Sequence, residues 1–173
     1  MKEKTLRLIL GNQLFPLEIQ NIEDRETVFM CEDFGLCTYE KHHKSKIALF
    51  FNAMRSFRDS LEAANIDCIY YDFNNKFEDS FIKKLSSEIK DNKFSCIRFF
   101  EIEDKPFENE VMQMISDLDI KCEVLNTPMF LDSRESFKNF VGDKKFLLQA
   151  NYYKKARKEM DILIENQKPV GGK

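Results

Sequence analysis

Gly11-Asn12-Gln13 is the first polar stretch of the chain, and it directly follows a short apolar segment. Its backbone N–H groups and two side-chain amides could hydrogen-bond a polar ligand, although the same residues are typical of a plain turn after a strand. The sequence has no G-x-G-x-x-G motif and no phosphate-binding loop ending in lysine. A standard dinucleotide or nucleoside-triphosphate site is therefore disfavoured.

Two adjacent histidines, His42 and His43, precede a long apolar helical pattern, and Lys44 and Lys46 follow them closely. Adjacent residues on a helix point about 100° apart, so the two imidazoles do not readily share one metal ion. The segment predicts either a solvated start of a helix or a polar wall over a ligand crevice.

Glu101, Glu103 and Asp104 form an acidic cluster after another apolar segment. Such carboxylates could serve acid–base catalysis, or they could cap the next helix. A small hydrolase would combine His43 with Glu32 or Glu101, but it would also need an exposed nucleophile beside the histidine. The neighbouring sequence nominates none, so we assign no catalytic residue.

Positive charge is concentrated near the C-terminal end of the sequence. This basic cluster predicts either a solvated helix face or an edge that contacts phosphates in a larger assembly. The formal net charge of -3 argues against strong nucleic-acid binding by the domain as a whole. The cluster consists of Lys144, Lys145, Lys154, Lys155, Arg157 and Lys158.

With 173 residues, 43% hydrophobic and 33% charged, the composition is typical of one ordinary globular domain. The five cysteines are scattered and form no C-x-x-C pair, which predicts reduced, buried thiols and no metal site. We find no secretory signal and no segment long enough to span a membrane, so we expect a cytoplasmic protein.

Five β-rich segments alternate with helical patterns, which predicts a Rossmann-like α/β fold. We expect a five-stranded parallel sheet with helices on both faces and a ligand crevice beyond the carboxyl ends of the strands. The expected strands are 6–10, 27–31, 67–71, 95–100 and 121–125, and the expected helical faces lie within 47–61, 81–89 and 111–118.

The pattern changes after the fifth predicted strand. Asp132 or Ser133 could cap a short helix, with Glu135 completing a capping box, and a longer helix would run over 148–164 with no later strand. We therefore divide the chain into an α/β domain, a helical extension and a Pro/Gly-rich start of an interdomain linker. Their ranges are 1–130, 131–167 and 168–173.

Five segments, spread in order over nearly the whole chain, resemble the photolyase/cryptochrome superfamily. The most similar branch is that of the iron–sulfur bacterial cryptochromes and prokaryotic (6-4) photolyases, or deoxyribodipyrimidine photolyase-related proteins. The segments are Leu8–Leu14, His42–Arg55, Thr127–Phe137, Tyr152–Arg157 and Pro169–Gly172.

The resemblance implies an N-terminal antenna domain that holds a light-harvesting chromophore such as 6,7-dimethyl-8-ribityllumazine. It also implies a C-terminal helical domain, absent from this sequence, that binds FAD and a [4Fe–4S] cluster and receives damaged DNA. The intact protein would then be a lyase or a blue-light sensor, whereas the 173 residues alone would be inactive. The alternative is a stand-alone α/β binding or scaffolding domain.

The resemblance also implies a set of chromophore-binding residues. The family usually has Gly-Asp-Gln where this chain has Gly11-Asn12-Gln13, and Leu36 stands where lumazine-binding relatives can have an acid. Losing two carboxylates weakens hydrogen bonding to a lumazine. The domain could therefore bind a lumazine, a different antenna chromophore or no chromophore. The implied residues are Gly11, Asn12, Gln13, Glu32, Leu36, Tyr39, His43, Lys46, Phe50 and Glu101.

Overall fold

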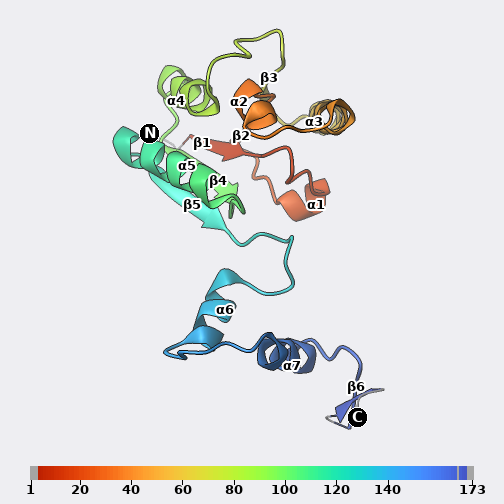
Figure 1. The fold of residues 1–173 in the computed structure, drawn as a ribbon. Coiled ribbons are helices and arrows are strands. Elements are labelled where there is room, and N and C mark those ends of the chain that lie inside the picture. Colours follow the sequence, from red (N-terminus) through yellow and green to blue (C-terminus); the bar gives the residue numbers. More distant parts are fainter. Residues whose placement is uncertain (1–3, 167, 171–173) are drawn as a thin grey trace. The chain divides into compact units, whose positions relative to one another are not determined.

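The computed structural model describes residues 4–166 and 168–170. The chain forms two compact units, Met1–Thr127 and Pro128–Lys173. The first unit contains a five-stranded sheet with helices, and the second contains two helices and a small hairpin (Figure 1).

The sheet of the first unit is parallel throughout, with strand order β3-β2-β1-β4-β5. This arrangement confirms the predicted α/β fold. The order reverses between β1 and β4, and such a reversal opens a crevice at the carboxyl ends of the strands. The strands are β1 (Thr5–Leu8), β2 (Glu26–Cys31), β3 (Cys68–Tyr71), β4 (Cys96–Phe100) and β5 (Lys121–Leu125).

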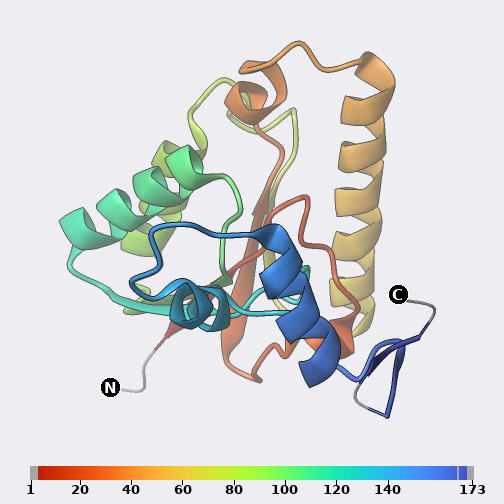
Figure 2. The ribbon, with the colours of Figure 1, turned by 60° about the horizontal axis from the view of Figure 1, so that its bottom comes forward.

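Helices cover both faces of this sheet because alternate strand residues are apolar on each side. Leu8 and Phe29 pack with α4 (Phe81–Asp91) and α5 (Lys105–Leu118) in one core. Ile9 and Val28 pack with α3 (Lys44–Ala63) in the other. Figure 2 shows α3 on one side of the strands and α4 and α5 on the other. The short helices are α1 (Leu17–Gln20) and α2 (Phe34–Thr38).

The predicted start of α5 is confirmed, because the Asp104 carboxylate accepts a hydrogen bond from the Phe107 N–H at 3.0 Å. The first strand ends two residues earlier than predicted. Ile9 and Leu10 are still buried, but they lead out of the sheet toward the crevice instead of extending β1.

The second unit contains α6 (Arg134–Val141), α7 (Gln149–Glu159), β6 (Ile164–Glu165) and β7 (Lys168–Pro169). Ser133, not Asp132, caps α6 by accepting from the Ser136 N–H.

The prediction of one helix over 148–164 was wrong. Asp161 and Leu163 have positive φ angles of 52° and 51°, which end the helix and lead into a hairpin. The prediction of no later strand was also wrong, because β6 pairs with β7. Of the predicted linker, Lys168 and Pro169 form β7, and residues 171–173 lie outside the described residues.

A buried ion pair joins the end of β2 to α4. Lys84 Nζ lies 3.1 Å from Asp33 Oδ2, and both side chains are almost wholly buried. Asp33 also caps α2, since its Oδ1 accepts from the Leu36 N–H at 2.9 Å. Removing one member of such a pair leaves the other charge buried without a counter-ion, which lowers the free energy of unfolding by several kcal/mol.

We expect Lys84→Met to lower the free energy of unfolding by about 3 kcal/mol, because the Asp33 carboxylate would lose its counter-ion. Lys83→Met is the matched control. Lys83 is the preceding residue of α4, its side chain is exposed, and its ion pair with Asp79 contributes under about 1 kcal/mol. Urea denaturation measures both. Equal losses in the two variants would contradict a structural role for the buried pair.

Candidate chromophore site

A cavity of about 1350 Å³ opens at the carboxyl ends of β1, β2 and β4 and extends along α4 and α5 as far as Lys90 and Leu118. Its lining residues come from the loops after these strands and from α2, α3, α4 and α5, all within the first unit. The cavity therefore lies at the switch point of the sheet, where open α/β folds bind their ligands.

One wall of the cavity is apolar and aromatic. Phe34 and Leu36 come from α2, and Phe50, Phe51 and Met54 come from α3. Phe34 and Phe51 both contact Phe77 edge-on, with ring centroids 5.7 and 6.1 Å apart. Such a wall can pack against a flat heteroaromatic ring.

Another part of the lining, which we call the polar end, connects the loop after β1 with the loop after β4. The Glu103 carboxylate accepts hydrogen bonds from Asn12 Nδ2 at 3.2 Å, Gln13 Nε2 at 3.3 Å and Thr127 Oγ1 at 3.2 Å. Gln13 Nε2 also donates to the Glu101 carbonyl at 2.8 Å. These bonds fix a carboxylate at the switch point, with Asn12 and Glu103 lining the cavity.

Gly11 allows the loop after β1 to approach α3 closely. A Cβ at this position would lie 2.9 Å from Met54 Sδ, which is closer than real Cβ contacts allow. A side chain here would require Met54 to shift, so glycine favours this close packing, and a phosphate cradle is not needed to explain it.

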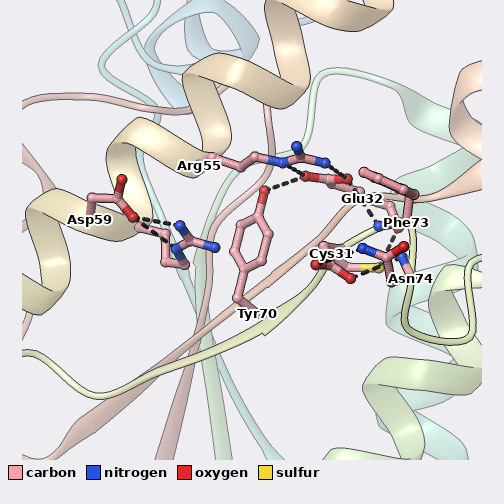
Figure 3. Close-up of polar contacts among 9 residues, drawn as sticks. Cys31, Glu32, Arg55, Asp59, Tyr70, Phe73 and Asn74 are labelled. Carbon is pink, nitrogen blue, oxygen red and sulfur yellow. Dashed lines mark hydrogen bonds and ion pairs between the residues drawn. The ribbon is translucent and has the colours of Figure 1, made fainter.

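Glu32 lies just after β2 and is fully buried (Figure 3). Its two oxygens accept from Arg55 Nε at 2.6 Å and Arg55 NH2 at 2.8 Å, from Tyr70 Oη at 2.8 Å and from the Phe73 N–H at 3.1 Å. The hydrogen bond to Glu32 raises the pKa of Arg55, while burial, followed by the bond to Glu32, raises the pKa of Tyr70. Four donors occupy this carboxylate, which therefore anchors α3 to the sheet.

Two cysteines, Cys31 and Cys37, line the cavity. Burial raises the pKa of Cys31 to about 12, so its thiol stays protonated at neutral pH and is a poor nucleophile. Among the described residues, no group of three or more His, Cys, Asp or Glu side chains is placed to hold a metal ion.

The cavity brings together six of the ten residues implied by the resemblance: Gly11, Asn12, Leu36, Tyr39, Lys46 and Phe50. The other four are not among its lining residues. Gln13 and Glu101 lie behind Glu103, Glu32 is held by Arg55, and His43 caps α3 by accepting from the Ser45 N–H at 3.2 Å.

Several lining residues were not expected at the site from the sequence, among them Phe34, Phe51 and Met54, whereas Asp33 and Glu103 lie at the strand ends where a ligand was expected. Phe51 and Met54 were expected only as members of an apolar helix face. Both residues also pack in the core beside Ile9, Val28 and Met30, so the apolar pattern alone does not separate the two roles.

These features define a doubly wound α/β domain with a cavity at its switch point. The chain belongs to the family described as "Deoxyribodipyrimidine photo-lyase-related protein", which matches residues 7–173. The resemblance seen in the sequence is thereby confirmed.

Two known proteins are similar to this chain. A (6-4) photolyase of Agrobacterium fabrum is 28% identical over 172 residues, which cover 97% of this chain and 34% of that protein. An uncharacterized protein of Acanthamoeba polyphaga mimivirus is 25% identical over 181 residues, covering 98% of this chain and 90% of that protein. The chain thus spans about a third of the photolyase. No helix in the described part of the chain could cross a membrane.

We expect Tyr70→Phe to lower the free energy of unfolding by about 1–2 kcal/mol, because the buried Glu32 carboxylate loses one donor. Tyr39→Phe removes the same hydroxyl from a side chain that is 64% exposed, and we expect no measurable loss there. Chemical denaturation of both variants tests this difference. A Tyr70→Phe protein as stable as the parent would show that Glu32 does not depend on this bond.

Proposed function

We propose that this chain is the antenna-chromophore-binding domain of a photolyase- or cryptochrome-like flavoprotein. The observation that carries the proposal is the cavity at the switch point, which has an aromatic wall on α2 and α3 and a hydrogen-bonding end at Asn12 and Glu103. Its ligand would be 6,7-dimethyl-8-ribityllumazine or a similar compound with a flat ring and a polyhydroxylated side chain.

The chemistry of the two ends supports this class of ligand. A heterocyclic ring would pack between Leu36 and Phe50, which both line the cavity. Both side chains are partly exposed, at 38% and 37%, so they have apolar surface that a ring could bury. Ribityl hydroxyls would donate to Glu103, a carboxylate that lies within hydrogen-bond distance of Asn12.

The intact protein would hold FAD and a [4Fe–4S] cluster in a C-terminal helical domain, and DNA would bind only through that larger assembly. The second unit supports such a partner, because many of its large apolar side chains are exposed. Monomeric proteins rarely leave such surfaces bare. The exposed residues include Phe130, Leu131, Phe137, Phe146, Leu148 and Tyr153. Without the flavin, the present chain would position a chromophore and perform no chemistry, so we assign it no catalytic residue.

A second candidate function is a stand-alone α/β binding or scaffolding domain. The match to the mimivirus protein favours it, because 90% of that protein aligns with this chain. The intact mass of the protein in its own cells separates the two proposals. A species much heavier than 20.6 kDa supports a domain of a flavoprotein, and a species of 20.6 kDa supports a separate domain.

We expect the purified chain to bind 6,7-dimethyl-8-ribityllumazine, measured by the change in lumazine fluorescence on titration. Phe50→Ala should weaken binding about tenfold, because it removes one aromatic surface from the ring site. Leu49→Ala is the matched control, since Leu49 precedes Phe50 on α3, is 67% exposed and does not line the cavity. No binding, or equal losses in both variants, would contradict the proposed site.

A further inference from the structure

The polar end of the cavity carries negative charge that no described cation neutralises. The partners of Glu103 are two amides and a hydroxyl, all of them neutral. Next to it, Asp104 is exposed and also lines the cavity. A ligand group that reaches the switch point therefore meets two adjacent carboxylates.

Two of the four helix N-termini at this cavity, those of α2 and α5, are capped by carboxylates, which oppose the binding of an anion there. Asp104 caps α5 through the Phe107 N–H, and Asp33 caps α2 through the Leu36 N–H. Gly11, the glycine of the loop after β1, packs against Met54. A phosphate at the N-terminus of α2 or α5 would therefore lie beside a carboxylate.

The charge balance of the whole lining has the same sign. Among the described lining residues, six have carboxylate side chains, of which Asp33 is already paired with Lys84, and only two are lysines. Lys46 belongs to the aromatic end, where its Nζ lies 6.0 Å from the centre of the Phe50 ring, and Lys90 is on the last turn of α4. The carboxylates are Asp33, Glu78, Glu103, Asp104, Glu110 and Asp117.

We propose that Glu103 and Asp104 make this site selective for chromophores with a neutral polyhydroxylated side chain, and that they reject the phosphorylated forms of the same compounds. This inference rests on the proposed function and specifies its ligand class. Hydroxyl groups can donate to the fixed Glu103 carboxylate, whereas a phosphate is repelled by Glu103 and Asp104.

Two matched pairs of ligands test the proposal with the full chain. One pair is 6,7-dimethyl-8-ribityllumazine and its 5′-phosphate, and the other is riboflavin and flavin mononucleotide. Affinities are measured by fluorescence titration at low salt. The comparison uses whichever pair has an unphosphorylated ligand that binds the chain. We expect the phosphorylated member to bind at least about tenfold more weakly, and the difference to shrink as salt is raised.

Two variants assign the selectivity to residues. Glu103→Gln and Asp104→Ser should each raise the affinity for the phosphorylated ligand several-fold relative to its partner, and serine retains the ability to cap α5. Glu62→Gln is the control, because Glu62 is an exposed carboxylate of α3 outside the cavity. Thermal denaturation verifies that each variant is folded.

The results distinguish a failure of the proposed selectivity from a failure of the proposed chromophore binding. If the phosphorylated and unphosphorylated ligands bind equally, or if neither variant changes their ratio, the selectivity proposal is overturned and the chromophore site stands. If no unphosphorylated ligand binds, the proposed function itself fails.

Discussion

The reversal of strand order between β1 and β4 is the constraint on which the rest of the structure depends. Their loops leave toward opposite faces of the sheet, so no continuous backbone closes the gap at their carboxyl ends. Gln13 spans this gap, donating to the Glu101 carbonyl and to Glu103, and it is almost fully buried. The cavity beyond the strands is therefore closed at its polar end by side chains instead of by a glycine-rich loop.

Glu32 and Asp33 hold the two walls of this cavity. They are consecutive residues after β2, so they point in opposite directions from an extended backbone. Glu32 binds Arg55 of α3, on one face of the sheet, and Asp33 binds Lys84 of α4, on the other. Each buried carboxylate has a cation and further donors, which compensates for its removal from water.

The alternation of apolar strands and amphipathic helices predicted the sheet, its parallel direction and the cap at Asp104, because these depend on local sequence. The pairing of Glu32 with Arg55 and Tyr70 could not be predicted, since it joins three elements distant in sequence. Glu32 was expected to face a chromophore, and Phe51 and Met54 were expected only in the core. The end of α7 could not be predicted either. The apolar helical pattern continues beyond residue 159, but the backbone takes positive φ angles at Asp161 and Leu163.

The attachment of α3 and α4 to the end of β2 limits how far the walls of the cavity can move. Because buried ion pairs fix the spacing of its walls, a bound ring can cause little rearrangement, and little ordering entropy is lost on binding. A ring of different thickness would require altered side chains at the outer turns of α2 and α3, not a shift of whole helices. Chromophore preference in this fold can thus diverge through a few partly exposed residues, while the sheet and its buried charges stay constant.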